Sequence, residues 1–186
     1  MTSWAVCGTA CSGEASPAEH PDLPCCDDGR MTLEVARGRS GTDIRRILQA
    51  LPGWFGDPEA IEGYVAASES DDYDSLLATD GTSVIGVALV RRHFPETAEL
   101  HLIAVAPDAR GRGVGRLLVE HAAGSLATSG CALLSVHTVG PSFEDEPYAQ
   151  TREFYRRMGF LPLEEHTGLD WAGPTLILVR PLRQLR

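Results

Sequence analysis

The chain has 186 residues, a formal net charge of −10 and a hydrophobic share of 43%, of which few residues are aromatic. This length suits one ordinary domain with a single core, built mainly on aliphatic side chains. The negative charge argues against a nucleic-acid partner and suits a cationic one, and no apolar run is long enough to predict a membrane span.

The first thirty residues carry four of the five cysteines, which are Cys7, Cys11, Cys25 and Cys26. Their C-x3-C and C-C spacings lack the paired C-x-x-C knuckles of structural zinc sites, so we expect no metal. The segment is not a secretory signal, because it has no continuous apolar stretch, and this predicts a cytoplasmic protein. We expect residues 1–30 to be a disordered, dispensable tail before a single domain over residues 31–186.

The first half of this domain predicts a strand, two helices and a hairpin. "MTLEVARG" has strand character, and Thr42 and Asp43 offer caps for a helix over "DIRRILQAL". Asp57 and Pro58 begin a second helix. "YDSLLATD" and "TSVIGVALVRR" meet at an Asp-Gly pair, the strongest short hairpin signal, so these strands should pair antiparallel.

The second half alternates strands with helices. "AELHLIAVA" is a strand, and the helix that begins at Val114 stops at Ser129 and Gly130. "CALLSVHTV" is the next strand, "GPSFEDEP" a polar loop, "YAQTREFYRRMGF" a helix closed by Gly159, and "PTLILVRPL" the final strand. The strand–helix–strand unit over residues 98–139 implies a parallel, right-handed crossover. The order predicts an α/β fold with a mixed sheet and helices on its faces.

A basic, glycine-rich turn opens the helix at Val114. A helix start leaves backbone N–H groups unpaired and carries partial positive charge, so an anion is its natural occupant. Glycines let an anion approach the amides and arginines add charge around it. A diphosphate fits this turn, whose residues are Arg110, Gly111, Arg112, Gly113, Val114, Gly115 and Arg116.

Two common phosphate-binding motifs do not match the turn. A Walker loop needs a lysine, which this chain lacks, and a Rossmann fingerprint has wider glycine spacing than Gly111, Gly113 and Gly115. What does match is R-x-x-G-x-G from Arg110 to Gly115, preceded by "IAVAPDA". Here the chain resembles the GNAT superfamily of acetyl-CoA-dependent N-acetyltransferases. The segment "TREFYRRMGF" is similar to the family's F-Y-x-x-x-G-F motif, so the resemblance extends over residues 31–182.

The resemblance implies a GNAT-like mixed central sheet flanked by helices and splayed between strands four and five, in one N-acetyltransferase domain over residues 31–186. It implies acetyl-CoA as co-substrate, with the diphosphate at the turn and the pantetheine arm along the fourth strand, on Ile103, Ala104 and Val105. The family commonly has Asn and Ala shortly before the last motif. This chain has Tyr148 and Thr151 there instead, so the usual Asn contact to the pantetheine arm has no counterpart.

The implied chemistry needs a base and an acid. An amine acceptor arrives mostly as ammonium and must lose a proton before it attacks the thioester. By resemblance Glu99 is the first candidate base, His101 on the same strand face is the second, and water the third. The same resemblance makes Tyr155 a cofactor contact and the general acid for the departing thiolate, with an aromatic cover over the cofactor as its other role. The alternatives are that Glu99 is simply a solvated carboxylate and that His101 is a packed histidine, without a role in proton transfer.

The acceptor side has weaker signals. Trp54, Phe55 and Tyr64 lie where the family builds its variable acceptor wall, and His101 and His137 could touch the acceptor. We expect direct acetyl transfer to a cationic amine, on a small molecule or a protein, with a homodimer compatible with the sequence. The alternatives are a non-catalytic acetyl-CoA-binding regulatory module and an enzyme acting on aminoacyl-tRNA, for which the negative charge is unfavourable.

Overall fold

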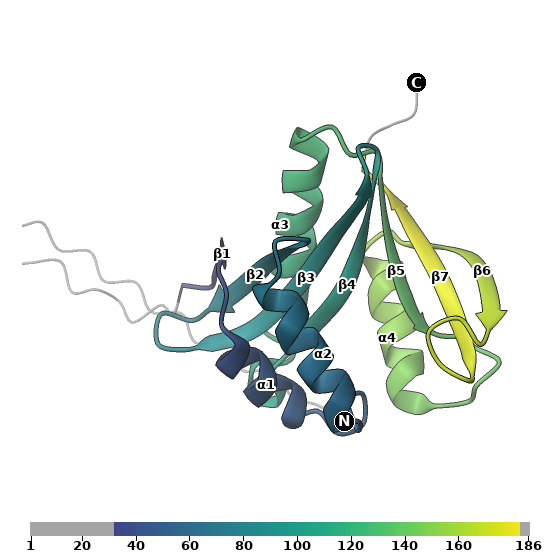
Figure 1. Cartoon of the computed structure of the whole chain (residues 1–186), viewed down its shortest axis with the longest axis horizontal. Coiled ribbons are helices and arrows are strands. Elements are labelled where there is room, and N and C mark those ends of the chain that lie inside the picture. Colours follow the sequence, from purple (N-terminus) through teal and green to yellow (C-terminus); the bar gives the residue numbers. More distant parts are fainter. Residues whose placement is uncertain (1–31, 183–186) are drawn as a thin grey trace, which may run out of the picture. The chain divides into compact units, whose positions relative to one another are not determined.

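The structure is a computed structural model that describes residues 32–182, within the unit Met31–Arg186. The predicted tail, residues 1–30, lies outside the described residues. The described part of the chain forms a seven-stranded mixed sheet in the order β1-β2-β3-β4-β5-β7-β6, with helices packed against it (Figure 1). The α/β class and the mixed sheet predicted from the sequence are therefore confirmed.

The first half follows the predicted order. Its elements are β1 (Glu34–Arg37), α1 (Gly41–Gln49), α2 (Pro58–Glu69), β2 (Tyr73–Thr79) and β3 (Val84–Phe94). The hairpin β2–β3 is antiparallel, as predicted, and Asp57 caps α2 with Pro58 in its first turn. The prediction that Thr42 and Asp43 cap α1 was wrong, because the helix begins earlier. Ser40 is the N-cap and accepts from the Asp43 amide, while its hydroxyl donates to the Asp43 carboxylate at 2.6 Å.

The second half contains one strand more than the sequence predicted. Its elements are β4 (Thr97–Val105), the 3-10 helix η1 (Pro107–Ala109), α3 (Val114–Thr128), β5 (Leu133–Val139), α4 (Glu146–Arg157), β6 (Leu161–Thr167) and β7 (Pro174–Pro181). The extra strand, β6, is exposed along its whole length and pairs only with β7, so no alternation of buried and exposed side chains marked it. Helix α4 begins inside the predicted polar loop, because Asp145 accepts from the Tyr148 amide and caps it.

The sheet opens between β4 and β5, as expected. The two strands pair in parallel only from Thr97 to Glu99, although β4 continues to Val105. Just beyond the last pair, Leu100 and Leu102 lie opposite neighbouring residues of β3, so His101 is an extra residue in β4. Such a bulge bends and twists the strand that carries it, and thereby turns β4 away from β5. Figure 1 shows the two strands separating toward the end that carries α1, α2 and α4.

Most of the core lies on the β1–β4 side of this opening, and Leu134, Val136, Phe160, Leu176 and Leu178 continue it on the other side. Helix α1 buries Ile44, Ile47 and Leu48 against β3 and β4, and α3 buries Leu118 and Val119 against the same half of the sheet. Helix α4 buries only Tyr155 and packs on β5. The two halves are thus well packed individually, and the opening between them is left for a site.

Candidate functional site

The opening between β4 and β5 is a cleft of about 1640 Å³. Its walls are the α1–α2 loop, α2, β4, the β4–α3 turn, β5, α4 and the β6–β7 loop. The predicted site residues that line it are Trp54, Phe55, Tyr64, Glu99, His101, Ile103, Ala104, Val105, Arg110, Gly111, Gly113, Val114, Gly115, Arg116, His137 and Tyr155. Arg112 does not line it and instead lies 3.9 Å from Asp80 in the β2–β3 loop.

The glycine turn presents bare backbone to the cleft. Gly113 is the N-cap of α3 with φ of 84°, a left-handed conformation that favours glycine, and it offers no side chain to the first amides of the helix. Gly111 is also left-handed, with φ of 75°. At Gly115 a side chain would be crowded by α4, because a Cβ there would lie 3.3 Å from the Phe154 ring. Arg116 is exposed and forms no ion pair within residues 32–182, so its charge is available to an anion.

Two histidines hold Glu99 from opposite sides. Its Oε1 lies 3.1 Å from His101 Nδ1 and its Oε2 lies 2.7 Å from His93 Nε2. His93 is a residue of β3 that no sequence pattern singled out. Burial alone would raise the pKa of this carboxyl, but the hydrogen bonds with His101 and His93 outweigh it and lower the pKa to about 2. Glu99 is therefore a carboxylate at any ordinary pH, fixed in place between two imidazole rings.

The low pKa predicts how this site contributes to stability. A carboxyl whose pKa falls from its ordinary 4.5 to about 2 on folding stabilises the protein fully above pH 4.5, and that stabilisation is lost as the pH falls toward 2. Glu99→Gln cannot ionise, so we expect it to be less stable than the native chain at neutral pH, with a difference that shrinks across this window. Urea unfolding of both proteins at a series of pH values measures the difference, and a constant gap would contradict the assignment.

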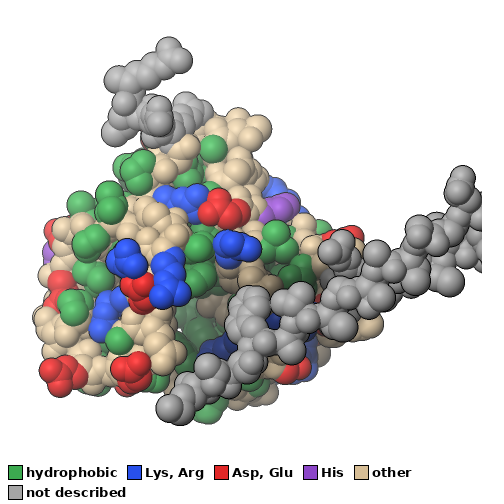
Figure 2. All heavy atoms as spheres, turned by 180° about the vertical axis from the view of Figure 1, so that it is seen from behind, with side chains coloured by type: hydrophobic (Ala, Val, Ile, Leu, Met, Phe, Trp, Pro, Cys, Tyr) green, Lys and Arg blue, Asp and Glu red, His purple; other side chains and the backbone are tan. Residues whose placement is uncertain are grey.

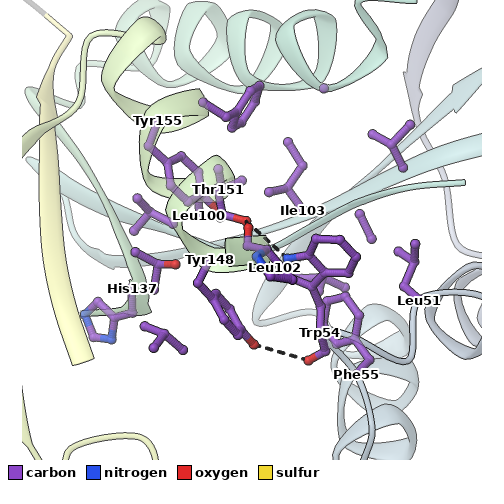
Figure 3. A pocket seen from close by; sticks show the side chains of 18 of the residues that line it. Leu51, Trp54, Phe55, Leu100, Leu102, Ile103, His137, Tyr148, Thr151 and Tyr155 are labelled. Atoms are coloured by element: carbon purple, nitrogen blue, oxygen red, sulfur yellow. Dashed lines mark hydrogen bonds between the residues drawn. The ribbon is translucent and has the colours of Figure 1, made fainter. Parts of the chain in front are cut away.

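Tyr155 reaches the cleft from α4. It is 5% exposed, and its ring packs on Phe154 and Phe160, with ring centroids 5.4 Å and 5.5 Å away. Burial, together with Tyr64 and Tyr148, raises the pKa of this phenol above its ordinary range, which keeps the hydroxyl protonated. Among the described residues the hydroxyl has no hydrogen-bond partner, so it remains a donor for a ligand (Figure 3).

The other end of the cleft is aromatic and acidic. Tyr64 and Tyr73 both contact the His101 ring, with centroids 5.6 Å and 5.1 Å away, and Phe55 packs edge-on against Tyr64. Across the opening, His137 Nδ1 lies 3.0 Å from a carboxylate oxygen of Asp170.

Beside Asp170, Phe143 and Trp171 form an edge-to-face pair with ring centroids 5.5 Å apart, and both side chains remain more than 40% exposed. The sequence did not single out Asp170, Phe143 or Trp171, because two loops that are distant in the chain bring them together. The result is an apolar surface next to a carboxylate, inside the same cleft.

Several basic side chains elsewhere on the domain form local ion pairs. Seen from behind, basic side chains gather near the middle of the face with acidic ones among them, beside a hollow lined by hydrophobic side chains (Figure 2). Arg156 and Arg157 both pair with Glu153, and Arg180 pairs with Glu120. Between residues 32 and 182, no cluster of three or more His, Cys, Asp or Glu side chains is arranged to hold a metal. In the same span, no helix has the length and hydropathy needed to cross a membrane.

Comparison with known proteins gives concordant matches. Residues 71–162 match a family model described as an acetyltransferase (GNAT) domain. A mycothiol acetyltransferase of Beutenbergia cavernae is 29% identical over 149 residues, which cover 80% of this chain and 39% of that protein. One of Gordonia bronchialis is 27% identical over 156 residues, covering 80% and 48% respectively. The chain thus spans less than half the length of these two curated relatives.

Solved structures share the fold. A GNAT-family acetyltransferase from Desulfovibrio desulfuricans superposes with a TM-score of 0.72 at 23% identity, over 82% of this chain and all of the other. A GNAT-family acetyltransferase from Elizabethkingia anophelis, solved with acetyl-CoA bound, gives a TM-score of 0.61 at 17% identity, over 80% of this chain and 97% of the other. At these identities the likeness concerns the arrangement of helices and strands.

Proposed function

Because the chain belongs to the GNAT acetyltransferase superfamily, we propose that it moves the acetyl group of acetyl-CoA directly to an amine acceptor. One observation carries the proposal most: a bare helix start, a free phenol and a histidine–carboxylate pair line one cleft at the splay of the sheet. Each of these groups matches one requirement of acetyl transfer to an amine.

The proposed site for acetyl-CoA offers backbone groups of α3 and β4 to the cofactor. The amides at the start of α3 would receive the diphosphate, since Gly113 offers them no side-chain acceptor and Arg116 adds a free charge. Beyond Glu99, β4 no longer pairs with β5, so the backbone groups of Ile103 and Val105 on that edge are available to the amides of the pantetheine arm.

The proposed reaction needs proton transfers at the nitrogen and at the sulfur. The ammonium first loses a proton, the free amine nitrogen then bonds to the thioester carbonyl carbon, and the C–S bond breaks as the nitrogen loses its second proton and the departing thiolate gains one. A carboxyl with a pKa of about 2 is a weak base, so we assign proton removal to the His101 imidazole and its orientation to Glu99. The Tyr155 hydroxyl, protonated and without a partner among residues 32–182, is the donor for the thiolate.

This assignment changes the order of candidate bases that the sequence suggested, in which Glu99 came before His101.

Cys131 is not a nucleophile in the proposed reaction. It is fully buried, outside the cleft, and its thiol donates to backbone carbonyl groups of Glu96 and Leu133. Direct transfer therefore needs no acyl-cysteine intermediate.

The acceptor that suits the cleft is a cation with an apolar part. The Asp170 carboxylate can pair with an ammonium group, and Phe143 and Trp171 offer exposed rings beside it. The negative charge of the chain, −10, favours approach of such an acceptor. Whether the amine belongs to a small molecule or to a protein is decided by the experiment below.

The function is tested with the full chain, acetyl-CoA and a panel of amines. The panel holds phenyl-bearing amines, aliphatic polyamines, aminoglycosides and peptides with free N-termini or lysines, followed by CoA release and by the mass of the acetylated product. Turnover with one class supports the proposal and identifies the acceptor. Binding of acetyl-CoA without turnover of any amine would instead favour the regulatory module, and absence of binding would exclude both.

The aromatic pair at the acceptor end predicts a selective effect. Trp171→Ala should raise the KM of a phenyl-bearing amine about tenfold, because the ring contact is lost, while kcat changes little. The matched control is Phe94→Ala, since Phe94 is also an exposed aromatic residue, at 66%, but lies outside the cleft. If Trp171→Ala and Phe94→Ala have the same KM for this amine, the acceptor does not use the aromatic pair.

A further inference from the structure

A tryptophan bridges the open end of the splay. Trp54, in the loop between α1 and α2, donates a hydrogen bond from indole Nε1 to Thr151 Oγ1 at 3.1 Å. Its carbonyl oxygen accepts one from the Tyr148 hydroxyl at 3.4 Å. Both partners lie on α4, so the loop and the helix are joined across the cleft (Figure 3). Tyr148 and Thr151 are also the two positions at which the sequence departs from the family pattern.

The protons of the bridge are consistently assigned. The Thr151 hydroxyl donates to the carbonyl oxygen of Pro147 at 3.0 Å, which leaves its lone pairs to accept from the indole. Burial and the nearby Asp145 raise the pKa of Tyr148, so its hydroxyl stays protonated and can only donate to the Trp54 carbonyl. Neither bond therefore competes with another for its proton.

The indole ring of Trp54 also contacts the glycine turn. The Arg110 guanidinium carbon lies 4.3 Å from the centre of the indole ring, in a cation–π contact. Arg110 is the first residue of the turn, so Trp54 stands between the turn and α4. Ile103 of β4 lines the same cleft. A pantetheine arm that ran from the turn along β4 would have to pass this tryptophan.

The loop that carries Trp54 is anchored at Leu51, and its residues beyond Leu51 are partly or fully exposed. The amides of Trp54 and Phe55 both donate to the carbonyl oxygen of Leu51 at 3.0 Å, and Leu51 is buried in the core. Gly53, next to the tryptophan, has no atom near its Cβ position. The Trp54 side chain makes the Thr151 hydrogen bond and the Arg110 contact, its backbone carbonyl takes the Tyr148 bond, and its partly buried ring packs against the edge of the core. Opening therefore means breaking these contacts and lifting the ring from the core edge, while Leu51 stays in place.

We propose that Trp54, Thr151 and Tyr148 form a gate that opens to admit the pantetheine arm of acetyl-CoA and closes again over it. This inference rests on the proposed cofactor site. Since the bridge is made both before and after binding, its bonds slow entry and exit equally and leave the affinity unchanged. Loss of one bond then lowers the barrier to opening in both directions.

Stopped-flow binding of acetyl-CoA to the full chain tests the gate. The chain has three tryptophans, so Trp4→Phe and Trp171→Phe leave Trp54 as the fluorescent reporter. In this background Thr151→Val removes the acceptor of the indole bond, and we expect kon and koff each to rise about fivefold, as one hydrogen bond predicts, with Kd within twofold. Tyr148→Phe should act in the same direction, by a smaller factor because its bond is longer.

Thr128→Val is the matched control. Thr128 Oγ1 donates to the Gly124 carbonyl, the same helical hydrogen bond that Thr151 makes with Pro147, but on α3 outside the cleft. Its rates should equal those of the parent. If Thr151→Val raises koff alone, Trp54 is an ordinary ligand contact; if it raises kon alone and tightens Kd, the cofactor displaces the bridge.

Either result overturns the gate, as do rates that match the control. A parent protein that does not bind acetyl-CoA at all would overturn the proposed function, and the gate with it. Binding of acetyl-CoA by the parent protein therefore tells a failure of the gate from a failure of the proposed function.

Discussion

Tyr155→Phe is expected to lower kcat about 100-fold, the lower end of what general acid catalysis contributes, since a CoA thiolate is a fair leaving group. The substitution removes the hydroxyl that we assign to the departing sulfur and keeps the ring that packs on Phe154 and Phe160. The loss should be equal in kcat and in kcat/KM, as for an interaction made only in the transition state.

Binding and stability separate this role from a structural one. The Tyr155 hydroxyl has no hydrogen-bond partner among residues 32–182, so its removal should leave the thermal midpoint and the Kd for acetyl-CoA close to those of the native chain. Turnover of Tyr155→Phe near the native value would mean that the ring merely covers the cofactor and that solvent protonates the thiolate.

Gly113→Leu is expected to weaken acetyl-CoA binding by about 100-fold. A side chain at this N-cap would occupy the place of the diphosphate at the first amides of α3, and the charge-assisted hydrogen bonds lost there are each worth about 1.5–3 kcal/mol. Isothermal titration calorimetry with acetyl-CoA measures the loss, and circular dichroism checks that the fold is kept.

The control must share the backbone strain of this substitution. Gly113 has φ of 84° and Gly81, in the β2–β3 loop, has φ of 89° with open space around its Cβ position. Both leucine variants should lose about 1–2 kcal/mol of stability, since a side chain disfavours this conformation. Only Gly113→Leu should lose affinity. Equal affinities of the two variants would place the diphosphate elsewhere.

Much of the fold could be predicted because its signals are local. The Asp-Gly pair predicted the β2–β3 hairpin, Asp57 and Pro58 the start of α2, and the strand–helix–strand unit the parallel pairing of β4 with β5. Strand β6 could not be predicted from periodicity, because among the described strands it pairs only with β7 and it leaves Leu161 and Leu163 exposed. Strand β6 forms because its backbone pairs with β7, and not because it buries an apolar face.

The candidate site divides in the same way. The glycine turn could be predicted because adjacent residues form it, and Glu99 and His101 because they are two residues apart on one strand. His93, Asp170 and the Trp54 bridge could not be predicted, since each depends on side chains from elements distant in the sequence. The bulge at His101 also left no mark, because a bulge is a property of two paired strands and not of one.

Strand β6 also bears on how the protein behaves at high concentration. An edge strand presents unpaired backbone groups to which another chain can add, and here the edge carries exposed leucines as well. Pro162 lacks an N–H group, a register shift interrupts the ladder next to it, and Glu164 and Glu165 follow. These features make β6 a poor template for an added strand, so this edge of the sheet is protected against fibrillar self-association by its own sequence.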